Sequence, residues 1–198
     1  MMRHKIAYLH RSEVDDAASD SVLVAACGDG DATALGTLFD RYHVAVYRFL
    51  SSMSGTDGPD LDDLVQTTFI QVGRSAHRFA GRSSLRSWIF GIGANVARHH
   101  IRSEVRRRLA TNALEALQVH NNDSLQASVE RREQIKLLAE ALPRLSHKLR
   151  VVFVMCDLEG ISGIEAANTL GIKQGTLWRR LHDARKKLGQ AIERRHVR

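Results

Sequence analysis

The sequence predicts an all-α fold of two small helical domains joined by a flexible linker. Apolar residues recur at helical spacing through most of the 198-residue chain, which contains only two prolines. Short turns rich in glycine or serine separate the helical segments, whereas residues 109–128 are polar with scattered aliphatic side chains. We therefore expect an N-terminal arm at 1–19, a first domain at 20–108, the linker at 109–128 and a second domain at 129–198.

The composition favours an anionic partner. The formal net charge is +7 and the isoelectric point is about 9.9, and a charge pattern carried on helices suits nucleic acid better than a membrane. Cys27 and Cys156 lie within apolar helical patterns, which indicates buried thiols in a reducing compartment. No segment approaches the roughly 20 apolar residues of a membrane span, and the first ten residues lack an apolar signal core. We expect a cytoplasmic protein.

No metal or cofactor site is expected from the histidines. The ten histidines are scattered, and the adjacent pair His99 and His100 cannot share one helix face. The sequence also offers no residues to which we assign catalysis.

The first domain begins with two helices. Asp20 or Ser21 can cap a short helix that the turn at 28–30 ends, and Asp31 opens a longer one. Apolar positions repeat along this longer helix almost to its end, and they predict a core-facing stripe: Leu35, Leu38, Phe39, Tyr42, Val46, Phe49, Leu50 and Met53.

The third helix, at 60–79, carries aspartates in its first turn. Asp60, Asp62 and Asp63 complement the helix dipole there. A divalent metal site is the alternative, but no histidine or further carboxylate is placed to complete a coordination shell. The outward face combines carboxylates and amides with the apolar Ile70, which suits a protein partner better than DNA.

Ser83 or Ser84 can cap the fourth helix, which begins at Leu85. Trp88 falls in phase with Leu85 and Ile92, so we expect it in the core and not as a platform for stacked bases. The outward positions are basic, and they hold more arginines than the dipole of a helix C-terminus needs. Phosphate contact is the expected role of this face.

The second domain ends in a predicted helix-turn-helix at about 162–182. Ser162 and Glu165 match a capping box, Ala167 allows close helix packing, and Gly171 suits the turn. A second helix starts near Gln174, with an apolar inner face and a basic outer face. An ordinary helical hairpin with a solvated face is the alternative, but these signals together favour DNA recognition.

These residues resemble the sigma-70 family of bacterial RNA polymerase sigma factors, and in particular its extracytoplasmic-function group. The resemblance covers about 22–108 and 129–195. Its most specific pieces are DLDDLVQTTFIQV, FAGRSSLRSWIFGIGANVARHHIR, LPRLSHKLRVVFVMCDLEGIS and GTLWRRLHDARKKL. The resemblance implies a non-enzymatic factor, made of a sigma-2-like and a sigma-4-like domain, that binds core RNA polymerase and promoter DNA. It also implies an anti-sigma factor that covers the basic faces.

The resemblance also assigns residues. The clamp helices of the largest polymerase subunit would contact Asp62, Asp63, Leu64, Gln66, Thr67, Phe69 and Ile70. The downstream (−10) promoter element would contact Arg82, Ser83, Ser84, Arg86, Asn95, Arg98, His99 and Arg102. The upstream (−35) element would contact Gln174, Thr176, Arg179, Arg180, Asp183, Arg185, Lys186 and Lys187.

Four residues depart from the family pattern. Thr67 stands where a carboxylate is commoner, Gly73 where a large aromatic is, and Ala166 where a bulkier aliphatic is. Trp178 replaces a residue that is more often lysine, and we expect it to pack at the domain edge and not against a thymine methyl. Two rival functions are an operator-binding regulator of another class and a metal-dependent nuclease, and the acidic helix at 62–70 argues against the first.

Overall fold

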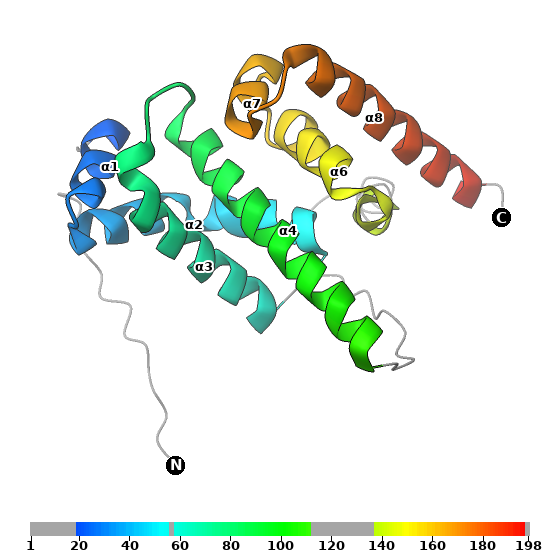
Figure 1. The fold of residues 1–198 in the computed structure, drawn as a ribbon. Coiled ribbons are helices and arrows are strands. Elements are labelled where there is room, and N and C mark those ends of the chain that lie inside the picture. Colours follow the sequence, from blue (N-terminus) through cyan, green and yellow to red (C-terminus); the bar gives the residue numbers. More distant parts are fainter. Residues whose placement is uncertain (1–18, 56–57, 112–136, 197–198) are drawn as a thin grey trace, which may run out of the picture.

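The computed structural model describes residues 19–55, 58–111 and 137–196, and every regular element within these ranges is helical (Figure 1). The first domain contains α1 (Asp20–Gly28), α2 (Ala32–Ser54), α3 (Pro59–Ser75), a 3₁₀ turn η1 (Ala76–Arg78) and α4 (Leu85–Thr111). The second contains a helical stretch at 137–141, then η2 (Leu142–Arg144), α6 (His147–Phe153), a π-helical turn η3 (Val154–Leu158), α7 (Gly163–Leu170) and α8 (Gln174–His196). The arm predicted at 1–19 lies almost wholly outside the described residues, as does the linker except for 109–111, which continue α4.

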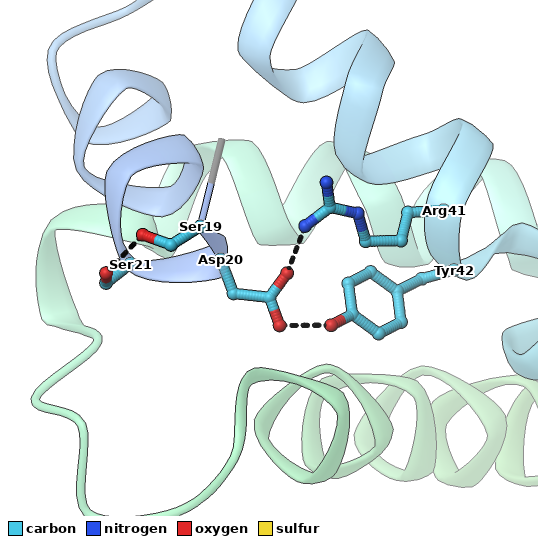
Figure 2. A network of polar contacts seen from close by, with 5 residues as sticks. All are labelled: Ser19, Asp20, Ser21, Arg41 and Tyr42. Carbon is cyan, nitrogen blue, oxygen red and sulfur yellow. Dashed lines mark hydrogen bonds and ion pairs between the residues drawn. The ribbon is translucent and has the colours of Figure 1, made fainter. Parts of the chain in front are cut away.

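Asp20 connects α1 to α2 (Figure 2). Its carboxylate accepts a hydrogen bond from Arg41 at 2.7 Å and another from the Tyr42 hydroxyl. Burial, together with this bond, raises the pKa of Tyr42. Asp20 is available for these contacts because the N-cap of α1 is Ser19, one residue earlier than expected.

The long stripe of α2 forms the centre of the first domain, as predicted. The side chain of Asp31 caps the helix by accepting from the backbone N–H groups of Thr33 at 2.7 Å and Ala34 at 3.2 Å. Most of the stripe is buried, but Phe39 stays 38% exposed, with its ring edge to face against Phe69 of α3. Helix α2 packs against α1, α3 and α4, so it organises the domain.

The buried face of α4 differs from the prediction. Phe90, which the spacing did not single out, is fully buried and stacks on Phe49 with ring centroids 4.5 Å apart. Trp88 and Ile92 are only partly buried, and Trp88 meets Phe79 edge to face. Ile89 is buried, as its place on the inward face predicts, but the core-facing stripe is rotated toward Phe90. The reason is that α4 packs against α2 on one side and against the second domain on the other.

The helix-turn-helix forms where it was predicted. Gly171 ends α7 in the left-handed conformation with φ +62°, and α8 begins at Gln174. The inner face of α8 is buried, as expected, through Leu177, Leu181, Ala184 and Leu188. Within α7, Ile164 is 57% exposed, whereas Ala166 and Ala167 are buried. Small side chains on the inner face let α7 approach α8 closely.

The two domains share one apolar core. The buried cluster runs without a break from Leu23 in α1 to Leu188 in α8. The buried guanidinium of Arg150 on α6 reaches into the first domain, where it donates to the carbonyl of Met53. It also donates to the carbonyls of Pro143 at 2.6 Å and Leu145 at 3.1 Å. Sequence reasoning missed Arg150, because its spacing resembles that of any exposed arginine.

Candidate functional site

The outer face of α3 presents acidic and amide side chains. Its exposed residues include Asp62, Asp63, Gln66, Thr67 and Ile70. The other two residues assigned to this face, Leu64 and Phe69, are 6% and 4% exposed, so the structure places them in the core. They face inward because they share the helical stripe of Leu61 and Val72. Being buried, both side chains pack beneath the exposed residues of this face.

A groove of about 560 Å³ lies between α3 and α4. Leu64 and Thr67 line it from the predicted polymerase face, and Asn95 and His99 line it from the predicted DNA face. The two predicted surfaces of the first domain therefore meet along one groove.

The residues expected to contact the −10 element gather along the loop at 80–84 and the outward side of α4. Arg82, Ser84, Asn95, His99 and Arg102 are exposed, whereas Ser83, Arg86 and Arg98 are partly buried. Ser84 is the cap of α4, because its hydroxyl accepts from the backbone N–H of Ser87 at 3.2 Å. Arg86 lies over the ring of Phe90, with its guanidinium carbon 5.1 Å from the centroid.

Part of this surface is covered by the second domain. The Glu165 carboxylate accepts from the backbone N–H of Ser84 at 2.8 Å, and the Glu159 carboxylate pairs with Arg86. Arg86 also donates to the Glu159 carbonyl at 3.2 Å. The predicted capping box is therefore only half formed: Ser162 accepts from the Glu165 N–H at 3.3 Å, but the Glu165 side chain serves the other domain.

The outer face of α8 holds the residues expected to contact the −35 element. Gln174, Arg179, Asp183, Arg185, Lys186 and Lys187 are exposed, and Thr176 and Arg180 are partly buried. Arg185 makes a two-point ion pair with Asp157, at 2.9 Å and 2.6 Å. This pairing raises the pKa of the Arg185 guanidinium, which stays charged in any case.

Trp178 lies on the same exposed side of α8, and 52% of its surface is exposed. The rim of its indole ring rests over Gly163 at the start of α7, where a methyl group would lie 2.6 Å from two ring carbons. Trp178 thus packs at the domain edge through one end of its ring, and the rest of the side chain is exposed. Sequence reasoning did not count this residue among the DNA contacts.

Within the described ranges, no group of three or more metal-binding side chains comes together. No helix in the same ranges is long and apolar enough to cross a membrane. Within these ranges, the aspartates in the first turn of α3 therefore do not belong to such a group.

The chain has two helical units, each with a basic face, and the first unit also has an acidic face. The second unit contains a helix-turn-helix. These features together are typical of a two-part DNA-binding transcription protein. Comparison with known proteins agrees. Residues 38–107 match the model of sigma-70 region 2, and residues 135–188 match that of sigma-70 region 4. The chain therefore belongs to the sigma-70 family, in its extracytoplasmic-function (ECF) group, whose members direct RNA polymerase to promoters.

Relatives align over nearly the whole length of the chain. The ECF RNA polymerase sigma-E factors of Salmonella typhimurium and Escherichia coli are each 27% identical to it, covering 88% of this chain and 95% of theirs. That of Haemophilus influenzae is 26% identical and covers 88% of this chain and 96% of its own.

Two solved structures share the fold. CnrH in complex with the cytosolic domain of CnrY has a TM-score of 0.63 and 27% identity, covering 88% of this chain and 97% of that one. The sigma factor RpoE of Bartonella quintana, in complex with the anti-sigma factor NepR, has a TM-score of 0.63 and 22% identity, covering 80% and 96%.

Proposed function

We propose that this sigma factor divides its task among three helices. The outer face of α3 binds core RNA polymerase, the loop at 80–84 with α4 holds the −10 element, and α8 reads the −35 element. The protein acts in the cytoplasm without catalysis of its own. The observation that supports this division most is that the carboxylates and amides of α3 face outward on a protein of net charge +7.

The charges support separate partners for these faces. A surface with Asp62 and Asp63 repels a polyanion, so it suits a protein better than DNA. The exposed Ile70 adds apolar area to that surface. The exposed side of α8 instead carries arginines and lysines next to polar groups that can reach base edges, which is the usual composition of a recognition helix.

Control by an anti-sigma factor is part of the proposal. Structural relatives of this chain include CnrH in complex with the cytosolic domain of CnrY, at 27% identity. We expect an inhibitor that covers the same surfaces that core polymerase and DNA need.

Run-off transcription with purified core polymerase tests the proposal. We expect the wild-type protein to select a start site on a promoter taken from a randomised library. Asp63→Arg should abolish core binding and transcription, while duplex DNA binding by α8 persists. Asp40→Arg, which makes the same charge change at an exposed position of α2, is the matched control and should behave as wild type.

An Asp63→Arg protein that still supports normal transcription would show that the docking face is wrongly assigned. A wild-type protein that binds duplex DNA but neither core nor start sites would instead identify an operator-binding regulator.

A further inference from the structure

A cluster of basic side chains lies where α4 of the first domain meets α6 of the second. His147, the first residue of α6, donates from Nε2 to the Ala94 carbonyl of α4 at 3.0 Å. Arg98 follows Ala94 by one turn of α4 and Arg102 by two turns, so both lie on the side of α4 that makes this contact. Arg150 stands one turn after His147 on α6. We call His147, Arg98 and Arg102 the junction cluster.

The charges of the junction cluster are not balanced by carboxylates. Among the described residues, none of its three members pairs with an aspartate or a glutamate. The Nε of Arg98 is buried and has no hydrogen-bond acceptor. The neighbouring Arg150 donates to backbone carbonyls, which carry no net charge. Like charges close together and a buried donor without an acceptor are both unfavourable, and one anion relieves both.

The imidazole of His147 is the group that responds to an anion in this place. Because a carbonyl oxygen only accepts, the proton of the neutral ring lies on Nε2, and Nδ1 is then an acceptor. Burial lowers the pKa of His147, the Ala94 carbonyl raises it, and the charges of Arg150, Arg98 and Arg102 lower it further. These arginines are the charged groups that act on the ring from α4 and from its own helix. An anion beside Nδ1 favours the protonated ring, which donates from both nitrogens.

A small phosphate ion suits these donors. A guanidinium binds phosphate oxygens through parallel N–H groups, and a protonated imidazole adds one further donor. Arg102 is exposed, whereas Arg98 and His147 are partly buried, so an ion that arrives from solvent meets Arg102 first. A phosphate of the DNA backbone carries a sugar on each side. It therefore approaches a buried Nε less closely than a free ion does.

We propose that Arg98 and Arg102 of α4 and His147 of α6 form a binding site for a small phosphate anion, which is either inorganic phosphate or the terminal phosphate of a nucleotide. The bound anion joins one helix of each domain and gives Arg98 the acceptor that it lacks. The site lies outside the division of tasks proposed above, although Arg98 and Arg102 belong to both. A phosphate bound here therefore competes with the −10 element for these two arginines.

The pKa of His147, followed by NMR of the full chain, tests the site. The probe is sulfate at constant ionic strength, since its charge stays the same between about pH 8 and 6. Sulfate should raise the pKa of His147 by about 1, because the anion stabilises the protonated ring. By linkage, sulfate should also bind about fivefold more tightly at the lower pH. An unchanged pKa of His147 up to the highest sulfate concentration would overturn the proposal.

His147→Gln is the first variant for this measurement. Its amide can still donate to the Ala94 carbonyl, but it does not titrate. Sulfate should bind this variant with an affinity that does not change with pH. A pH dependence that matches that of the wild type would assign the effect to another group and contradict the role of His147.

Loss of one exposed arginine separates a site from general attraction to a basic protein. Arg102→Gln should weaken sulfate binding about fivefold, because it removes a two-point donor. Arg48→Gln removes the same charge from an exposed position of α2 and should change the affinity less than about twofold. Equal losses in the two variants would show that net charge alone attracts the ion, which would overturn the proposal.

Three competitors identify the source of the phosphate. Inorganic phosphate, a nucleoside triphosphate and a single-stranded −10 oligonucleotide are each added to the protein in sulfate. Displacement of sulfate by inorganic phosphate supports a site for the free ion, and displacement by the triphosphate alone supports a nucleotide site. If only the oligonucleotide displaces sulfate, or if none of the three does, Arg98 and Arg102 do not belong to a small-anion site and the proposal is wrong.

Discussion

The two surfaces that we propose to bind DNA differ in what covers them. The start of α4 is occupied by carboxylates of the other domain, whereas the outer face of α8 is open apart from the pairing of Arg185 with Asp157. Both surfaces are basic, so charge alone cannot explain the difference. The comparison teaches that contacts between the two domains occupy polar groups of the one surface and leave most of the other exposed.

The covered surface also shares an apolar core with the domain that covers it. The buried cluster includes residues of both units, and Arg150 spans them. Separation must therefore expose apolar area, which weak polar contacts would not require. The open surface of α8 has no such cost, because its inner face stays packed on α6 and α7.

The largest expected effect comes from Phe90→Ala. Removing a fully buried ring that stacks on Phe49 should lower the free energy of unfolding by about 3–5 kcal/mol. Because the core is continuous, Trp178 fluorescence in a Trp88→Phe background should report the same loss from the second domain. A second domain that unfolds at an unchanged urea concentration would show that the two units are not coupled.

Gly91→Ala should open the covered surface. A methyl group there would lie 2.7 Å from Cγ2 of Thr169, so the interface must shift. We expect a larger radius of gyration by X-ray scattering and about fivefold tighter binding of a −10 oligonucleotide. Gly36→Ala is a matched control, because it also gains helix propensity but has nothing within 4 Å of the new methyl group. Identical behaviour of the two variants would mean that Thr169 adapts without opening.

Acid should favour separation through His147. Its Nε2 lies 3.0 Å from the Ala94 carbonyl across the domains. Burial lowers the pKa of His147, and the charges of Arg150, Arg98 and Arg102 lower it further against the opposing effect of that carbonyl.

Since the pKa is lower in the packed state, the open state gains the proton first, and stability is lost as the pH falls below about 6.5. A fluorescence transfer pair across the domains should therefore report opening between about pH 7 and 5.5. His147→Gln should flatten this pH dependence, and an unchanged profile in that variant would assign it to another group.

The smallest effect is expected on the open surface. Asp157→Asn should release Arg185 for phosphate contact and tighten duplex binding about twofold, since an exposed ion pair competes only weakly. The logarithm of the binding constant should also fall more steeply with the logarithm of salt concentration, by the amount that about one further phosphate contact adds. Weaker binding would show that the ion pair positions Arg185 for DNA.

Sequence reasoning succeeded where signals are local. The cap at Asp31, the turn at Gly171 and the inner face of α8 follow from neighbouring residues, and the structure confirms all three. It missed Phe90, because burial at this position depends on which neighbouring helix lies against the face. The residue assignments to polymerase and DNA remain predictions, with Leu64 and Phe69 now placed inside the core.

Helical periodicity, capping side chains and the order of motifs were enough to define an all-α protein with a helix-turn-helix, since each depends on interactions within a few residues along the chain. The partner of Glu165 was beyond such reasoning. A capping box predicts that this carboxylate turns back to its own helix, yet it bonds Ser84, 81 residues away. That choice depends on two folded surfaces meeting, and no spacing along the chain encodes it.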